Sequence, residues 1–360
     1  YVLCRSSEYR PEGTRIAVCT VDEEYVNVFA RGVGQQGPHE YNFEDGSLVW
    51  PTCIAIDSEQ NVYVSDEWLD RISIFSKDGE FLSKWEERRG DGDGELNRPS
   101  GMAFDKDDNL YIVDSLNNRV QKFTKDGKFL AKWGEHGSGE GELNRPSGIA
   151  FDADGNLLVV DTMNHRVQKF TAEGNFISTF GEQGYGNGQF DMPWGIALDP
   201  DDGSIVIGDW RNDRVQRFSS EGEYISQFGT PGDGLGELCR PAGVAIDEHG
   251  DIYVADRGNH RIQLFGQHGN FVDVFVGDAG LSTSGRIYIS ANPKVLRSRD
   301  LIPLVELKRL RGPASVRVDG DLMYIPDFGA HRIQIYRKEA YELTEEQIYD
   351  APSAPSLYTV

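Results

Sequence analysis

A sequence phrase that returns at nearly constant spacing constrains the fold of this chain more than any other feature. The copy at Pro146 reads PSGIAFDADGNLLVVDTMNHRVQKFTAEGNFISTFG, and close variants follow it. Six copies begin at Pro51, Pro99, Pro146, Pro193, Pro241 and Pro313. Successive starts are 48, 47, 47, 48 and 72 residues apart, and the last interval holds an insertion. A period of this length indicates an array of one supersecondary unit rather than a single aperiodic domain.

Each copy predicts four short strands. In the copy at Pro146, GIAFD and LLVVD are apolar, RVQKF alternates, and FISTF ends the unit. An Asp-rich turn (152–156) separates the first two strands, and D/E-G turns such as Asp126–Gly127 separate the last two. Four-stranded antiparallel units at this period are typical of propeller blades. The chain is therefore expected to be all-β, a six-bladed β-propeller of four-stranded antiparallel blades forming one domain over 1–360.

The motif D-x-x-N-x-R-(V/I)-Q, nearly intact in four units, resembles the core of the NHL repeat, and the resemblance covers about 51–337. It implies a propeller, usually of six blades. Wider relatives include strictosidine-synthase-like enzymes, amidating lyases and interaction modules. In the amidating lyases a His after the inner-strand Pro of several blades holds an axial zinc. The matching positions here, Thr52, Ser100, Ser147, Trp194, Ala242 and Ala314, offer no good zinc ligand, so neither the lyase activity nor a metal or other cofactor is carried over.

Two segments depart from the repeat. Residues 1–50 are a lead-in whose part 14–29 is similar to a second and third strand. They are expected to complete the last blade beside 340–349. Residues 277–312 are an insertion between blades five and six with strand-like stretches of their own. If 14–29 instead joins this insertion, the two make a seventh blade.

Features that occur in every blade are expected to serve the scaffold. An Asp ends each second strand and an Arg begins each third strand; in the third copy these are Asp161 and Arg166. An Asp and an Arg that face each other across a loop are expected to form a charge-assisted, bidentate pair. His165, His260 and His331 precede these arginines and are interpreted in the same way.

The net charge of −23 narrows the choice of partners. Such a surface repels phosphate backbones and anionic membranes, so neither nucleic acid nor a membrane is expected as a partner. No apolar run is long enough to span a bilayer. The four cysteines, Cys4, Cys19, Cys53 and Cys239, lack metal-site spacing and are expected to be free thiols. A soluble cytoplasmic protein is favoured, and a secreted or periplasmic one stays open.

Positions at which one blade departs from the others are the candidates for function. Aromatic departures lie on the loops of one face and could wall a pocket for an apolar or aromatic ligand. The candidate ligand-binding residues are Trp194, Trp68, Trp210 and Tyr185, with Trp50 and Phe328 nearby and with Ser100 and Ser147 as polar neighbours. The alternative is that each aromatic side chain packs against the adjacent blade.

Charged departures supply a second set. Arg98, Arg145 and Arg240 precede inner-strand prolines. They could bind a carboxylate or phosphate at the axis, although pairing with the neighbouring acidic loops 91–95 and 140–142 is favoured. The insertion carries seven basic residues within 286–311 and is a possible contact for an acidic protein segment. Weak catalytic candidates are His39, His136 and Cys53, together with the same three arginines.

These features favour a non-catalytic propeller that binds a small ligand or a protein segment at the funnel on its top face. An enzyme, either a lyase or a hydrolase acting at the funnel mouth, is the alternative. RNA binding, known among NHL proteins, is disfavoured by the acidity. The sequence alone does not decide between binding protein and enzyme, because propellers serve as both.

Overall fold

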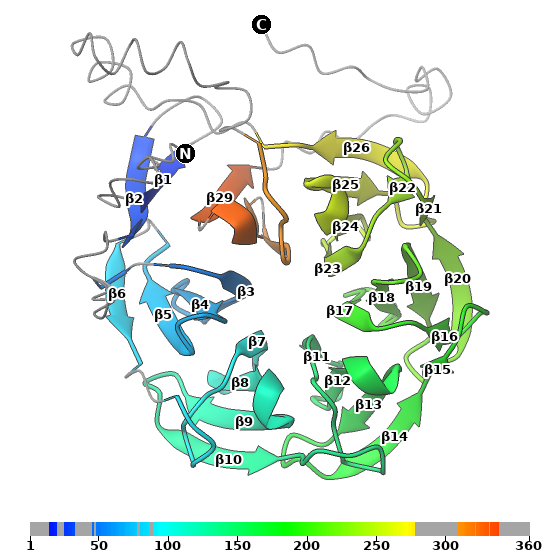
Figure 1. The fold of residues 1–360 in the computed structure, drawn as a ribbon, viewed down its shortest axis with the longest axis horizontal. Coiled ribbons are helices and arrows are strands. Elements are labelled where there is room, and N and C mark those ends of the chain that lie inside the picture. The colour runs from blue at the N-terminus through cyan, green and yellow to red at the C-terminus, as the bar shows by residue number, and fades with distance from the viewer. Residues whose placement is uncertain are drawn as a thin grey trace, which may run out of the picture.

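The computed structural model describes residues 14–19, 25–32, 45–46, 48–77, 80–85, 89–277, 309–320, 322–330 and 332–337. Six sheets stand around a central axis, and their innermost strands face one another (Figure 1). Chain order follows the ring, and the sixth blade returns to the first, where Ser315 Oγ donates a hydrogen bond to the Thr52 carbonyl oxygen at 2.8 Å. The six-bladed propeller expected from the sequence is confirmed.

Five blades are antiparallel sheets of four strands in sequence order. Blade one holds β3 (Pro51–Ile56), β4 (Val62–Asp66), β5 (Arg71–Phe75) and β6 (Phe81–Lys84). Blade two holds β7 (Pro99–Phe104), β8 (Asn109–Asp114), β9 (Arg119–Thr124) and β10 (Phe129–Trp133). Blade three holds β11 (Ile149–Phe151), β12 (Leu157–Asp161), β13 (Arg166–Phe170) and β14 (Phe176–Phe180). Blade four holds β17 (Pro193–Leu198), β18 (Ile205–Asp209), β19 (Arg214–Phe218) and β20 (Tyr224–Phe228). Blade five holds β23 (Pro241–Ile246), β24 (Ile252–Asp256), β25 (Arg261–Phe265) and β26 (Phe271–Phe275).

The sixth blade differs from the others. Its described strands are β27 (Arg317–Asp319), β28 (Leu322–Asp327) and β29 (Arg332–Arg337). The strands β1 (Thr14–Cys19) and β2 (Tyr25–Gly32) pair with each other as a separate two-stranded sheet, and β1 lies beside β29 (Figure 1). That 14–29 completes the last blade stays a prediction, because β1 and β2 form a sheet of their own. The expected neighbour, 340–349, lies outside the described residues, as does most of the insertion 277–312.

Short elements occupy the loops. Single-turn 3₁₀ helices follow the second strands of four blades: η1 (Ser115–Asn117), η2 (Thr162–Asn164), η3 (Arg257–Asn259) and η4 (Phe328–Ala330). Two small parallel pairs lie in the loops between blades: β15 (Glu182–Gln183) with β16 (Gln189–Phe190), and β21 (Thr230–Pro231) with β22 (Glu237–Leu238). Among the described residues no helix is long and apolar enough to cross a membrane.

The core consists of layers between adjacent blades rather than one central mass. Tyr63 and Ile72 of blade one pack with Leu110, Ile112 and Phe123 of blade two. Equivalent clusters join each further pair, including blades six and one. The second and third strands are almost wholly buried because both of their faces contact a neighbouring blade. This packing explains why the second strands, such as LLVVD of β12, are continuous apolar runs.

The repeated Asp and Arg form the predicted structural pair. In blade four, Asp209 Oδ2 accepts hydrogen bonds from Arg214 Nε at 2.9 Å and from Asn212 Nδ2 at 2.8 Å, and Oδ1 accepts one from the Asp191 N–H at 2.8 Å. Blades two, three, five and six repeat the Nε contact at 2.6–2.8 Å. The remaining N–H groups of Arg214 reach loop carbonyls such as that of Gly186 at 2.8 Å. The pair is therefore not bidentate, and it ties the loop between blades to the sheet.

Candidate functional site

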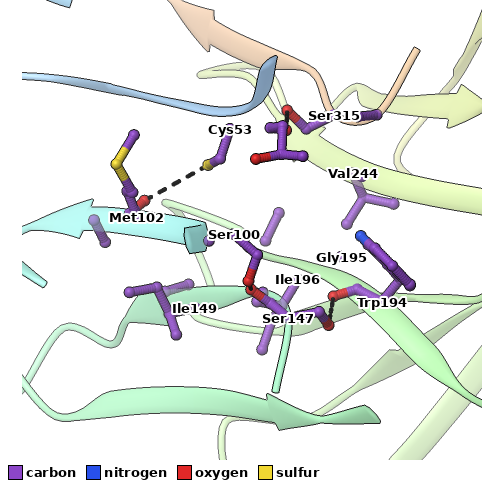
Figure 2. Close-up of a pocket in the computed structure, with 18 of the residues that line it drawn as sticks. Cys53, Ser100, Met102, Ser147, Ile149, Trp194, Gly195, Ile196, Val244 and Ser315 are labelled. Carbon is purple, nitrogen blue, oxygen red and sulfur yellow. Dashed lines mark hydrogen bonds between the residues drawn. The ribbon is translucent and has the colours of Figure 1, made fainter. Parts of the chain in front are cut away.

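A cavity of about 540 Å³ runs along the propeller axis. All six inner strands line it, and Figure 2 shows that side chains from several blades converge on it. Each inner strand begins beside the loop that follows its own second strand, since Pro99 pairs with Asp114 and Pro193 with Asp209. The end of the cavity where the inner strands begin is called the mouth below. A volume of this size is typical of sites for small molecules.

The wall of the cavity is apolar over most of its depth. Counted from the Pro that begins each copy, the fourth residue forms one apolar level: Ile54, Met102, Ile149, Ile196, Val244 and Val316. The sixth residue forms a second level at the end remote from the mouth: Ile56, Phe104, Phe151, Leu198, Ile246 and Val318. Small residues such as Ala103 and Ala150 separate these levels, and one cation, Arg317, lies near the remote end. The cavity can therefore hold an apolar body.

Arginines gather at the mouth. Arg98 and Arg145 lie just before inner strands, Arg257 begins η3, and all three line the cavity. One carboxylate, Glu67, accompanies them, and Arg98 Nη1 lies 3.3 Å from Glu67 Oε1. Burial raises the pKa of Glu67, although Arg98 and Arg257 oppose this shift. The lining as a whole holds four arginines and one acid, in a chain of net charge −23.

Arg257 is a partly buried cation. Its guanidinium lies 4.7 Å from the ring centre of Phe328, and burial lowers its pKa despite the favourable charge of Glu67. Among the described residues, the ion pairs include neither Arg257 nor Arg145. A desolvated guanidinium without a carboxylate partner gains free energy when an anion binds beside it.

The arginines do not form the ion pairs with the acidic loops that the sequence favoured. Arg98 contacts Glu67 instead of 91–95, and the guanidinium of Arg240 lies 5.4 Å from the ring centre of Trp210. Arg240 does not line the cavity. The physical reason lies in the backbone: Arg98, Arg145 and Arg240 all adopt positive φ, and their N–H groups are held by Asp70, Asn118 and Asp213 of the preceding blade. This conformation directs each residue toward the preceding blade rather than back to its own loop.

Ser100 and Ser147 lie at the cavity, but both hydroxyls already have acceptors. Ser100 Oγ donates to the Ser147 carbonyl oxygen at 3.0 Å, and Ser147 Oγ donates to the Trp194 carbonyl oxygen at 2.7 Å (Figure 2). These contacts join the inner strands of neighbouring blades. The two serines are therefore links between blades, a role that the sequence did not reveal.

Cys53 also lines the cavity. Its Sγ lies 4.0 Å from the Met102 carbonyl oxygen (Figure 2). It also lies 3.7 Å from the Ile54 carbonyl oxygen. Burial raises the pKa of this thiol, which keeps it protonated at neutral pH, whereas a nucleophilic cysteine needs a lowered pKa. Cys53 and Cys239 are free thiols, as expected, and the other two cysteines fall outside the described side chains.

The aromatic candidates divide into two groups. Trp50, Trp68 and Phe328 cluster where blades six and one meet. The ring centre of Trp50 lies 4.7 Å from that of Trp68 and 5.1 Å from that of Phe328. Trp194 and Trp210 form a pair in blade four at 6.0 Å. Of the predicted aromatic set, Trp194 lines the cavity, whereas Trp68, Trp210 and Tyr185 do not. Tyr185 is 79% exposed and lies in the loop between blades three and four.

The histidine candidates are not at the axis. His136 is exposed and forms an isolated backbone β-bridge with Leu143 in the loop between blades two and three. His39 lies outside the described residues. The structural interpretation of His165 is supported, because its Nδ1 accepts a hydrogen bond from the Met192 N–H at 3.1 Å. Within the described part of the chain, no three His, Cys, Asp or Glu residues come together as metal ligands.

Sequence reasoning missed Arg257, Glu67 and the two methionines Met163 and Met192 at the mouth. A signal was present in the position directly after the Asp that ends each second strand. It varies more than its neighbours: Glu67, Ser115, Thr162, Trp210, Arg257 and Phe328. Four of these six residues line the cavity.

Family models match parts of the repeat region. The model described as NHL repeat matches 190–218 and 238–265, and the one described as a six-bladed β-propeller matches 103–181. No protein with a curated description matches the sequence.

Solved structures share the fold at low identity. A catalytically inactive variant of virginiamycin B lyase from Staphylococcus aureus with quinupristin is 14% identical, with a TM-score of 0.54, over 91% of this chain and 96% of that one. A gluconolactonase from Xanthomonas campestris is 13% identical, with a TM-score of 0.55, over 78% of this chain and 84% of that one. Similarity at this level supports the propeller architecture alone.

Proposed function

We propose that this chain, a six-bladed β-propeller of NHL repeats, binds in its axial cavity a small molecule with an apolar body and an anionic end group. The observation that carries the proposal is the contrast between the cationic mouth and the apolar wall below it. Arg145 and Arg257 would hold a carboxylate, sulfonate or phosphate group, and the apolar levels would enclose the body. The positive charges of these arginines repel one another, and an anion bound between them offsets that repulsion.

Binding without catalysis is the form of the proposal that the side chains favour. The hydroxyls of Ser100 and Ser147 are committed to carbonyl oxygens, and the Cys53 thiol is protonated. An activated nucleophile needs a base or a lowered pKa beside it. An acidic protein segment bound through 286–311 is a separate proposal, and residues 286–308 of that surface lie outside the described structure.

Removing the positive charge of Arg145 or of Arg257 should weaken the binding of an amphiphilic anion. We expect 8-anilinonaphthalene-1-sulfonate to bind with one-to-one stoichiometry, and Arg145→Gln and Arg257→Gln each to raise its Kd about tenfold or more, as for the loss of a charged hydrogen bond. Fluorescence titration measures both. N-phenyl-1-naphthylamine has the same ring system without the sulfonate, and its Kd should stay unchanged in both variants.

Lys128→Gln is the matched control, since it removes an exposed cation at the outer edge of blade two, far from the lining. Equal loss of affinity in Lys128→Gln and Arg145→Gln would show that affinity depends only on the net charge of the protein, and would overturn the proposal. Turnover of an ester or lactone by the unmodified protein, lost in Arg145→Gln, would establish an enzyme instead.

Replacing Trp194 should affect both probes alike. Trp194 lines the cavity and packs on Trp210, so Trp194→Ala removes apolar wall without removing charge. We expect weaker binding of the sulfonate and of the neutral probe by a similar factor, and a retained β-sheet circular dichroism spectrum. Affinity for both probes equal to that of the unmodified protein would place the ligand away from Trp194.

A further inference from the structure

A second ion pair recurs on the face of the propeller opposite the mouth. It joins the Asp that directly follows an inner strand to the fourth residue of the third strand of the same blade. Lys122 Nζ lies 3.2 Å from Asp105 Oδ2, Lys169 Nζ lies 2.7 Å from Asp152 Oδ2, and Arg217 Nη2 lies 2.6 Å from Asp199 Oδ2. In blade two, Lys122 Nζ also lies 4.8 Å from the ring centre of Tyr111. Three consecutive blades thus place a cation against this carboxylate.

Blade one keeps the carboxylate and the tyrosine but lacks the cation. Asp57 and Tyr63 correspond to Asp105 and Tyr111, whereas Ile74 replaces the lysine. Asp57 is 3% exposed and accepts hydrogen bonds from the Glu59 N–H, the Asn61 N–H and Asn61 Nδ2 at 3.0, 2.7 and 2.9 Å. No ion pair among the described residues includes Asp57. Its carboxylate is therefore hydrogen-bonded by neutral donors and forms no ion pair within the described residues.

A pocket of about 320 Å³ opens where blades one and two meet. Asp57, Tyr63, Ile74 and Trp85 contribute to its lining. Two lysines border the pocket, but Lys125 Nζ lies 2.6 Å from Glu59 Oε1 and Lys84 Nζ lies 3.2 Å from Asp45 Oδ1. Both ammonium groups therefore already have carboxylate partners.

Carboxylates make the electrostatic potential at the Tyr63 hydroxyl negative. Burial raises the pKa of the Tyr63 phenol, and the carboxylates of Asp57 and Asp126 raise it further. The Tyr63 hydroxyl donates a hydrogen bond to the Lys125 carbonyl oxygen at 3.0 Å, so it turns toward blade two rather than toward Asp57. Blade five differs here, because its Tyr253 hydroxyl lies 3.2 Å from Asp247 Oδ2.

We propose that the pocket between blades one and two binds a small alkylamine, whose ammonium group lies between the Asp57 carboxylate and the Tyr63 ring. That is the place that Lys122 Nζ occupies in blade two. The ammonium donates to the carboxylate and lies over the ring face, and the alkyl chain packs against Ile74 and Trp85. This site is separate from the axial cavity and independent of its proposed ligand.

The test uses n-butylammonium, which reproduces the end of a lysine side chain. Titration into the ¹⁵N-labelled protein should shift the amide signals of Asn61, Tyr63 and Trp85 in a saturable way. 1-Butanol, which has the same chain without the charge, should not shift them. Absence of saturable shifts with n-butylammonium in the unmodified protein would by itself overturn the proposal.

Two variants locate the site. Asp57→Asn keeps an acceptor for the turn but removes the charge, and it should raise the Kd for n-butylammonium about tenfold or more. Ile74→Lys should supply the cation from within the chain and abolish binding, whereas Ile74→Leu should retain it. Thermal melts check that each variant folds. Unchanged affinity in Asp57→Asn or in Ile74→Lys contradicts the proposal.

Discussion

Asp209→Ala should lower the free energy of unfolding by about 3–5 kcal/mol, the usual cost of leaving the partner of a buried ion pair alone. Asp209 is fully buried, and it accepts hydrogen bonds from Arg214 Nε, Asn212 Nδ2, Gln216 Nε2 and the Asp191 N–H. The variant leaves the Arg214 guanidinium, 7% exposed, without its carboxylate. It also releases the loop between blades three and four. Urea denaturation followed by circular dichroism measures the change.

Asp154→Ala is the matched control for this substitution. Asp154 is an exposed carboxylate in the turn of blade three, and its loss should change the free energy of unfolding by no more than about 0.5 kcal/mol. If Asp209→Ala were as stable as Asp154→Ala, the repeated Asp–Arg pair would not hold the blades. The conservation of the pair among the copies would then need a functional explanation.

The architecture was predictable because every copy of the repeat contains the residues that determine its own strands and turns. Strand lengths, D/E-G turns and the Asp–Arg pair each depend on a few adjacent residues, and six repetitions confirm one another. Gly127 illustrates this: it adopts φ 81° in the turn where the D-G dipeptide predicted a positive φ.

The site was less predictable because residues that are neighbours in sequence diverge in space. Glu67 lines the mouth, whereas Trp68, the next residue, is half exposed and packs on Trp50. Arg257 and Trp210 occupy the same repeat position, yet only Arg257 lines the cavity. Comparison of the copies shows which positions vary, but the direction of each side chain depends on loop backbone that the sequence alone does not specify.

Close approach of the inner strands leads to the second stability prediction. A Cβ built on Gly195 would lie 2.5 Å from the Ala242 carbonyl oxygen, 2.6 Å from Gly243 Cα and 2.9 Å from the Val244 nitrogen. All three atoms are backbone atoms of β23, which its pairing with β24 holds in place. Gly101 and Gly148 meet the carbonyl oxygens of the following blades in the same way. In these blades the diameter of the ring leaves no room for a methyl group.

Gly195→Ala should therefore lower the free energy of unfolding by about 3 kcal/mol, at the upper end for overpacking, even though alanine restricts the unfolded chain and offsets part of this loss. Cys53→Ala is the control, because Cys53 occupies the same repeat position in blade one, where the ring already accommodates a Cβ. This variant keeps the Cβ and removes only Sγ, so the free energy of unfolding should fall by about 1 kcal/mol or less. Urea titrations of both variants give the comparison. Equal stability of Gly195→Ala and the unmodified protein would mean that adjacent blades slide apart freely. The inner strands could not then fix the shape of the axial cavity.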